Sequence, residues 1–375
     1  MTQVLPVTSN KDLDRFVDFP HDLYKDDVNY VPEIFIGQKD LLSPNKHPFY
    51  EHSSVQCFLA FDENGKITGR IAAIHNKNHN KFVGAKDGFF GFFDCINDQE
   101  TARLLFEKAT EWLKEKGLNK IQGPASPTTN DVCGLLVDGF DSPPVAMMPY
   151  NASYYLTLLE NIGFTKKTDL LAYKVMHATV NDKSIRMLDL LEKRLLERNG
   201  IVIRKVNIKD FKNEVPKIRE IYNIAWAENE GFVPMTEHEF EYLAKDLKMI
   251  LNPDYCLLAE KDGKIVGFVL AIPDINQILI KNKRGRLLPF GIFRLLFQKK
   301  DIDMLRILTL GVIDGYRKLG IEACLYGGII KNSKGTKIKG GECSWMLEDN
   351  YMMNRALDQM NGELYKRYRL LEKEI

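Results

Sequence analysis

One phrase of the sequence occurs twice. Residues 57–74 read CFLAFDENGKITGRIAAI, and residues 256–272 read CLLAEKDGKIVGFVLAI. Each copy has a β-rich run, an Asn-Gly or Asp-Gly dipeptide and a second β-rich run, which is typical of a β-hairpin because these dipeptides accept the positive φ of tight turns. The copies lie about 199 residues apart in a chain of 375, and we take this spacing as a first sign that one fold was built twice.

The repeat extends on both sides of the hairpins. A short strand candidate and an amphipathic helix come before each hairpin, because apolar residues recur there at helical spacing. A strand, a helix, a second strand and a last helix follow it, and Asn151 and Asn350 open the two last helices. The ranges that we expect after the hairpins are 88–95, 101–117, 119–123 and 151–164 in the first half, and 306–312, 320–331, 341–347 and 350–364 in the second.

This order predicts an α+β protein of two tandem domains. We expect an N-terminal domain at 1–180, a helical linker at 181–200 and a C-terminal domain at 201–375. Each domain should have a mixed, mostly antiparallel sheet with flanking helices.

Composition narrows the class of protein. The net charge is +1, so no global field favours nucleic acid. The N-terminus has no basic flank followed by an apolar stretch, and no apolar run approaches the ~18 residues of a membrane span. The six cysteines form no CxxC pair, and the seven histidines show no metal-binding spacing. We therefore expect a cytoplasmic protein with reduced thiols and no metal.

A glycine-containing motif follows the strand candidate of the second half. The segment LGVIDGYRKLGIEACLY at 310–326 places Arg317 and Gly320 where a helix opens. Free N–H groups at a helix start hold phosphate well, glycine allows close approach, and a guanidinium adds charge. The segment therefore predicts an anion site.

The element order and this motif resemble the GNAT superfamily of acyl-CoA N-acyltransferases. The resemblance implies that acyl-CoA, commonly acetyl-CoA, binds where a central strand diverges from its neighbour, and that the acceptor is a small-molecule or peptide amine. On the family pattern, the candidate cofactor-binding residues are Leu310, Gly311, Val312, Arg317, Lys318, Leu319, Gly320, Ile321 and Asn350.

The whole chain also resembles a group of bacterial proteins with two GNAT-like domains in tandem. The stretches that carry this likeness are NYVPEIFIGQKDLLSPNKHPFYEH at 29–52, TGRIAAIHNKNHN at 68–80 and GPASPTTNDVCGLLVDGFDSPPVAMMPYN at 123–151.

Several positions depart from the GNAT pattern. Glu322 stands where the superfamily has its last Gly or Ala, and Ala356 stands where it often has a tyrosine general acid. The first half has no such glycine motif and carries acids after its strand, so we expect acyl-CoA to bind only the second domain. The resemblance implies a carboxylate or water as base and a tyrosine as acid; the catalytic candidates are Glu228, Glu348 and Tyr351.

Each half carries an insertion. The segment 123–151 is either a binding loop or a packed Ω-loop; its candidate substrate-binding residues are Asn130, Asp131, Asp141, Ser142, Tyr150 and Asn151. The segment 280–300 has seven basic residues and no acid among many apolar ones. It can form a helix packed on the sheet, a cover over acyl-CoA, or a peripheral contact with a membrane without stable insertion.

Three functions stay open at this point. The leading hypothesis is an N-acyltransferase that uses acyl-CoA in the second domain. A FemABX-like aminoacyl transferase, which also pairs two GNAT-like folds, is the second. A non-catalytic module that binds a ligand or partner is the third, and Glu322 and Ala356 favour it.

Overall fold

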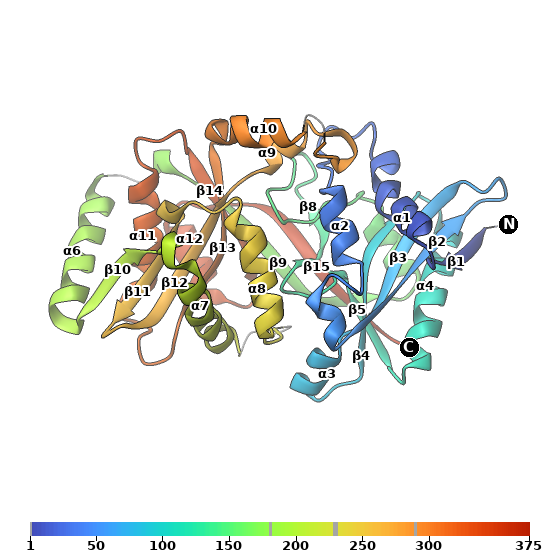
Figure 1. Cartoon of the computed structure of the whole chain (residues 1–375), viewed down its shortest axis with the longest axis horizontal. Helices are drawn as coiled ribbons and strands as arrows, with labels where there is room; N and C mark the ends of the chain where they lie inside the picture. The colour runs from blue at the N-terminus through green and yellow to red at the C-terminus, as the bar shows by residue number, and fades with distance from the viewer. Residues whose placement is uncertain (1, 180–181, 228–231, 289–290) are drawn as a thin grey trace. The chain divides into compact units, whose positions relative to one another are not determined.

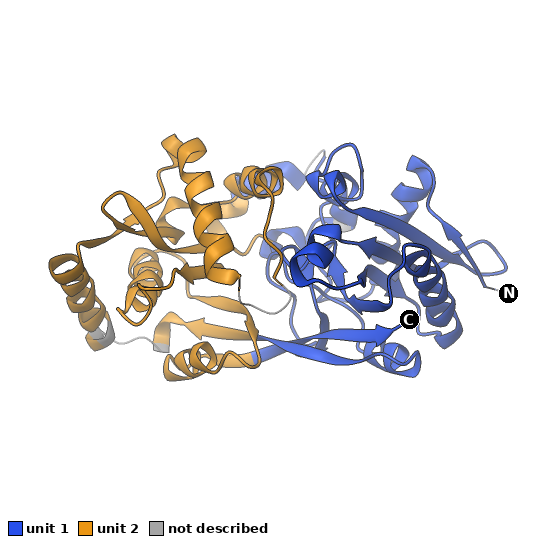
Figure 2. Ribbon diagram, turned by 90° about the horizontal axis from the view of Figure 1, so that it is seen from below, with its two compact units in different colours: residues 1–171, 276–297, 365–375 blue, residues 172–275, 298–364 orange. Residues whose placement is uncertain are grey.

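The elements of the computed structural model follow the repeated order that the sequence predicts (Figure 1). The structure describes residues 2–179, 182–227, 232–288 and 291–375. They divide into two compact units, which Figure 2 shows in two colours. Unit 1 consists of Met1–Leu171, Asn276–Phe297 and Tyr365–Ile375, and unit 2 consists of Ala172–Ile275 and Gln298–Leu364.

The units are therefore not two consecutive halves of the chain. Segments 276–297 and 365–375 come from the second half of the sequence but pack in unit 1. The domains at 1–180 and 201–375 describe the duplicated sequence, and these boundaries stay a prediction.

Unit 1 begins with a strand, two helices and a hairpin. Its elements are β1 (Gln3–Pro6), α1 (Asn10–Leu23), α2 (Phe35–Leu41), the 3-10 turn η1 (Pro48–Glu51), β2 (Ser54–Phe61), β3 (Ile67–His75), α3 (Lys77–Val83), β4 (Asp87–Cys95), α4 (Gln99–Glu115), β5 (Lys120–Gly123), β6 (Ala125–Ser126), β7 (Val132–Cys133), β8 (Leu135–Asp138) and α5 (Tyr155–Asn161). The later contributions are the first part of β9 (Thr165–Met176), α9 (Asn276–Leu279), η5 (Lys283–Gly285), most of α10 (Gly291–Gln298) and most of β15 (Glu363–Glu374).

The sheet of unit 1 runs in the order β1-β2-β3-β4-β5-β15. Its ladders are antiparallel except for the parallel pair β4–β5. Helix α4 packs on β2 and β3, and α1 also contacts β2, β3 and β4. Aromatic rings dominate the core: Phe90, Phe106 and Phe164 lie within 5.2 Å of one another between ring centroids.

Unit 2 repeats this order. After the end of β9 its elements are η2 (His177–Thr179), α6 (Asp182–Asn199), β10 (Ile201–Lys205), η3 (Ile208–Asp210), α7 (Phe211–Trp226), α8 (Glu237–Lys248), η4 (Pro253–Tyr255), β11 (Cys256–Lys261), β12 (Lys264–Pro273), η6 (Lys299–Asp301), β13 (Met304–Val312), α11 (Ile321–Ser333), β14 (Gly340–Leu347) and α12 (Tyr351–Gln359). Its sheet runs β10-β11-β12-β13-β14, and only β13–β14 is parallel.

Helix α6, which the sequence suggests as a linker, packs within unit 2. It contacts α11 and β10. The leucine side chains of α6 fill the space that glycines leave on α11: an added Cβ at Gly327 would lie 2.6 Å from Leu188. Lys331 of α11 also binds Asp189 and Glu192 of α6. These contacts make α6 a structural layer of unit 2.

The two hairpins that reveal the repeat have the same register. Ala60 pairs with Gly69 in β2–β3, and Ala259 pairs with Gly267 in β11–β12, and a bulge follows each pair. Both glycines lie under a helix: an added Cβ would sit 2.7 Å from Leu105 of α4 at Gly69 and 3.3 Å from Ile321 of α11 at Gly267. The predicted hairpins and the predicted fold class are thus confirmed.

Candidate functional site

The parallel strands of unit 2 diverge into a wedge. β13 pairs with β14 from Met304–Gly340 to Ile307–Cys343, and the pairing ends there although both strands continue. In its first part, β13 lies between β12 and β14. Further along the strand, the three residues Leu308, Thr309 and Leu310 are only half-buried. The hydroxyl of Thr309 is buried and has no hydrogen-bond partner in the described part of the chain. Beyond Ile307, the backbone of β13 is therefore not paired with β14.

The N-terminus of α11 has no side-chain cap. Its N-cap residue is Gly320, whose φ of 91° is favourable only for glycine. Glu322 is half-buried, and the structure gives it no hydrogen bond to the first-turn amides. These amides and the positive end of the helix dipole can therefore hold an anion.

Arg317 is folded back on its own loop. Its guanidinium donates to the carbonyl oxygens of Val312 at 3.2 Å and Ala225 at 3.5 Å, and it lies 3.1 Å from the exposed Asp314. The side chain itself is 44% exposed. Exposed ion pairs contribute little free energy, so Arg317 can leave these contacts for a stronger anion.

The other predicted cofactor-binding residues surround this loop. Leu310, Gly311 and Val312 pair with β12, and Gly311 packs against α7 so closely that a Cβ would lie 2.9 Å from Ala225. Ile321 is buried and Leu319 is half-buried, while Lys318 is exposed with a φ of 66°. Their roles in binding stay predictions.

The remaining cofactor-binding candidate, Asn350, and the catalytic candidate Tyr351 lie at the start of α12. Asn350 is the N-cap residue, and its side chain accepts a hydrogen bond from the backbone N–H of Met353 at 3.3 Å. Tyr351 is 79% exposed. The carbonyl of Glu348 accepts from Asn354 at 3.3 Å. Glu228 falls outside the described residues.

Unit 1 closes the equivalent wedge with its own chain. β4 pairs with β5 only from Asp87 to Phe89, but every later residue of β4 is buried. Strand β6 lies against it: an added Cβ at Gly91 would sit 1.9 Å from the carbonyl oxygen of Ala125, and the Ser126 hydroxyl accepts from the N–H of Phe92 at 3.1 Å. No ligand arm could enter there without displacing β6.

The N-terminus of α4, the helix that follows this wedge, is capped by a side chain. Asp98 is the N-cap residue of α4, and its carboxylate accepts hydrogen bonds from the N–H of Thr101 at 2.8 Å and from its hydroxyl at 2.6 Å. A carboxylate already holds the site that a phosphate would take. The two units therefore differ both at the wedge and at the helix start, the two places where the sequence predicts an acyl-CoA site.

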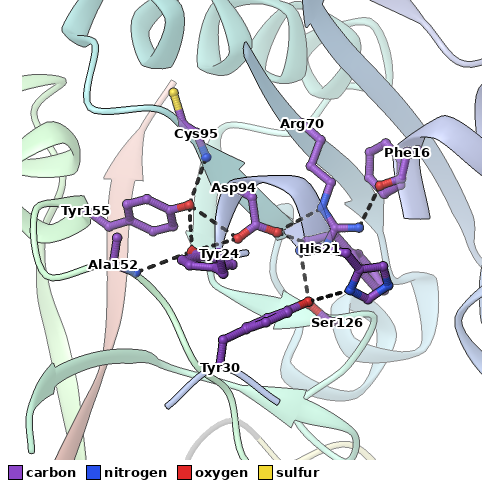
Figure 3. A network of polar contacts seen from close by, with 11 residues as sticks. Phe16, His21, Tyr24, Tyr30, Arg70, Asp94, Cys95, Ser126, Ala152 and Tyr155 are labelled. Carbon is purple, nitrogen blue, oxygen red and sulfur yellow. Dashed lines mark hydrogen bonds and ion pairs between the residues drawn. The ribbon is translucent and has the colours of Figure 1, made fainter. Parts of the chain in front are cut away.

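A buried polar network fills the end of β4 in unit 1 (Figure 3). The Asp94 carboxylate receives the guanidinium of Arg70 at 2.8 Å, and the hydroxyls of Tyr24 and Tyr155 lie 3.0 and 3.2 Å from its Oδ1. Burial raises the pKa of Asp94, and Arg70 opposes this shift. The N–H of Cys95 donates to Tyr155 at 2.8 Å. Each member is satisfied by another, so the network acts as a polar core.

His21 lies beside this network. Its Nδ1 is 2.9 Å from the hydroxyl of Tyr30. Burial lowers the pKa of His21 to about 4, and the guanidinium groups of Arg70, Arg284 and Arg286 act in the same direction. The imidazole is therefore neutral at physiological pH.

Only a weak signal for this network is present in the sequence. Asp94 is the one charged residue between Gly88 and Cys95, and an isolated acid in an apolar strand needs a partner when it is buried. Its partner Arg70 stands on β3, and the two tyrosines stand on α1 and α5. No spacing in the sequence connects these four positions.

The predicted substrate-binding loop makes mostly internal contacts. The Asp131 carboxylate binds the hydroxyl of Thr128 at 2.8 Å, and the N–H of Asn130 donates to that hydroxyl at 3.1 Å. The buried amide of Asn151 bonds both the N–H and the carbonyl of Leu136.

The remaining residues of the loop are similarly placed. Tyr150 donates to Asp27 at 2.6 Å. The Ser142 carbonyl accepts from the buried Lys366 at 2.8 Å, and Asp141 is exposed. This pattern favours the packed Ω-loop, and a role of these residues in substrate binding stays a prediction.

The described residues hold no group of three or more His, Cys, Asp or Glu side chains that could bind a metal ion. All six cysteines are buried, and none of them forms a disulfide. None of the described helices is long and apolar enough to cross a membrane.

The fold and the wedge define a tandem GNAT architecture. A solved tandem GNAT protein from the clavulanic acid biosynthesis pathway is similar over 100% of this chain and 98% of its own, with a TM-score of 0.59 and 9% identity. The GCN5-related glucosamine N-acetyltransferase region of a fungal β-N-acetylglucosaminidase is similar over 100% of this chain and 38% of that chain, with a TM-score of 0.58 and 15% identity. These likenesses show the fold, and the predicted resemblance to GNAT proteins is confirmed.

Two relatives identify the family more narrowly. Protein YghO of Escherichia coli (strain K12) is 37% identical over 375 residues, which cover 98% of this chain and 94% of the relative. The bacterial ceramide synthase of Caulobacter vibrioides (strain NA1000 / CB15N) is 33% identical over 381 residues, which cover 99% and 97%. The chain belongs to the family of these two proteins. No family model matches the sequence.

Proposed function

We propose that this protein is an N-acyltransferase that transfers an acyl group from acyl-CoA to an amine, with the acyl-CoA in the wedge of unit 2. The observation that carries the proposal is the open divergence of β13 from β14 after Ile307, together with the uncapped start of α11 at Gly320. The first-turn amides of α11 would hold the pyrophosphate. The edge of β13 beyond Ile307 would offer backbone partners to the pantetheine amides.

The reaction needs one proton to move. The amine nitrogen attacks the thioester carbonyl, the C–N bond forms and the C–S bond breaks. The attacking nitrogen loses a proton, and the CoA thiolate takes one up. We assign the base to Glu348 and the acid to Tyr351, which flank Asn350 at the start of α12; Glu228 remains a second candidate base.

The named activity of one relative suggests the substrate class. A ceramide is an amide between a fatty acyl group and a long-chain amino alcohol, so a ceramide synthase forms the kind of bond that a GNAT fold is suited to form. The 33% identity extends over 99% of this chain. We therefore propose a long-chain acyl-CoA as donor and a long-chain amino alcohol as acceptor.

Titration calorimetry with CoA tests the binding site. Arg317→Ala should weaken CoA binding about tenfold, the loss expected for one charge-assisted contact. Glu322→Gly should change the affinity little, because Glu322 does not occupy the first-turn amides. Arg103→Ala, an exposed arginine on the equivalent helix α4, is the matched control. Equal affinity in Arg317→Ala and Arg103→Ala would overturn the assignment to unit 2.

A second candidate function is a non-catalytic module that binds CoA or a related anion. The exposure of Tyr351 and the contacts of Arg317 with its own loop favour it. Mass spectrometry of the amide formed from a long-chain acyl-CoA and an amino alcohol separates the two functions. Binding of CoA without any amide, over a panel of amines, would establish the module; amide formation that Tyr351→Phe slows would support the enzyme.

A further inference from the structure

Helix α10 exposes a row of large apolar side chains. The exposed fractions are 37% for Ile292, 56% for Phe293, 67% for Leu296 and 69% for Phe297, and Leu288 just before the helix is 76% exposed. Only Gly291 is buried in this helix. The rings of Phe293 and Phe297 are nearly parallel, 6.5 Å apart between centroids. The helix, labelled at the top of Figure 1, therefore does not bury its apolar side chains against the sheet.

The four residues 292, 293, 296 and 297 follow helical spacing. Positions i, i+1, i+4 and i+5 lie on one side of a helix, so these side chains form a single patch. Exposed apolar side chains that occur singly need no explanation, but a contiguous group on one element marks an interaction site. The patch is too short to span a bilayer.

Basic side chains accompany the patch. The guanidinium of Arg294 donates to the backbone carbonyl of Lys281 at 2.7 Å, and both residues are exposed. Neither forms an ion pair with a carboxylate in the part of the chain that the structure describes. By contrast, Arg284 binds Asp22 at 2.7 Å and Arg286 binds Asp18 at 2.9 Å, so their charge is used within unit 1.

These ion pairs also anchor the segment. The Arg286 guanidinium stacks on the Phe35 ring at 3.7 Å, and an added Cβ at Gly285 would lie 1.7 Å from the Glu33 carbonyl oxygen. The segment before α10 is thus fixed to α1 and the start of α2.

We propose that α10 docks this protein on an anionic membrane surface. An amphipathic helix with phenylalanine and leucine on one side and cations beside them is the pattern that binds the boundary between headgroups and acyl chains. Anionic lipids attract each nearby cation, and the unpaired Arg294 and Lys281 supply that attraction. This proposal does not rest on the proposed acyl transfer, because it follows from α10 and its anchors alone.

Vesicle flotation tests the proposal in the absence of CoA and amine. The full chain is mixed with vesicles of phosphatidylcholine, with and without phosphatidylglycerol. We expect flotation with the anionic vesicles and much less with the neutral ones. Phe293→Ser with Phe297→Ser should lower the partition coefficient at least about tenfold, since two aromatic anchors leave the interface. Arg294→Glu should lower it and make it less sensitive to salt.

Leu190→Ser is the matched control, because Leu190 is 67% exposed on another helix, α6. It should float like the wild type. All variants should keep the wild-type circular dichroism, because the changed side chains are exposed. Absence of wild-type flotation, equal flotation on neutral vesicles, or equal flotation of the double variant would overturn the proposal. So would a wild-type dimer that the double variant dissociates, which would show that a second copy covers the patch.

Discussion

His21 makes a prediction about stability and pH. Its pKa is about 4 in the folded protein, against an ordinary value of 6.5. As the pH falls below 6.5, the unfolded chain binds a proton at this histidine that the folded chain does not bind. The free energy of unfolding therefore decreases as the pH is lowered from about 6.5 to about 4, and below pH 4 the contribution of His21 no longer changes. The loss from pH 7 to pH 5 is about 2 kcal/mol, and the full loss is about 3 kcal/mol.

The substitution His21→Gln isolates this contribution. Glutamine keeps a polar side chain near Tyr30 but does not titrate. Urea unfolding followed by circular dichroism at pH 7 and pH 5 gives the free energy for both proteins. We expect the wild type to lose about 2 kcal/mol more than the variant over this interval. Hydrogen exchange of peptides from β3 and β4 repeats the comparison locally.

His238→Gln is the control, because His238 is exposed on α8. This variant should follow the wild-type pH dependence. If His21→Gln loses as much stability as the wild type between pH 7 and pH 5, the buried, neutral state of His21 is refuted.

Two further predictions concern the closed wedge of unit 1. Gly91→Ala should destabilise the protein by about 1–3 kcal/mol or more, because the new Cβ would lie 1.9 Å from the Ala125 carbonyl oxygen. Gly341→Ala is the control and should destabilise the protein less, because its new Cβ would meet the flexible side chain of Ile307. Equal decreases of the melting temperature in the two variants would contradict this prediction. Asp94→Ala should cost about 3–5 kcal/mol in urea unfolding, since it leaves the Arg70 guanidinium buried without its carboxylate; a loss below about 1 kcal/mol would show that the pair is not a structural element.

The sequence predicts the order of elements well because local signals are strong. The Asn-Gly and Asp-Gly turns define both hairpins, and the predicted strand at 88–95 is observed as β4 at Asp87–Cys95. The predicted strand at 306–312 is observed within β13 at Met304–Val312. Turn chemistry and apolar periodicity act over a few residues, so one sequence is enough to read them.

Long-range arrangement is not accessible in this way. Strand β15 pairs with β5, with Leu371 opposite Gly123, although the two strands lie more than 240 residues apart in the sequence. Segment 276–297 packs in unit 1 through the ion pairs of Arg284 and Arg286 with Asp18 and Asp22. Such contacts depend on which surfaces meet, and no periodic pattern encodes that choice.

In the candidate site, too, the local features are predictable from the sequence and the long-range contacts are not. The glycine motif at Gly320 identifies the helix that starts without a cap, but the closure of the equivalent wedge by Ala125 and Ser126 depends on a strand of two residues. The absence of a glycine motif in the first half predicts that this half does not bind acyl-CoA, and this stays a prediction. No sequence pattern shows that the wedge of unit 1 is closed sterically, by the path of the chain after Gly123.

The place of β15 has a consequence for biosynthesis. The last strand of the chain completes the sheet of unit 1, where Tyr368 and Leu371 are almost fully buried. Strand β15 is synthesised long after β5, so most of unit 1 leaves the ribosome earlier but cannot close its core until β15 has followed. Domains usually fold in the order of their synthesis. In this chain unit 1 must wait for β15, and the long stretch of chain between β5 and β15, which includes unit 2, makes that step slow.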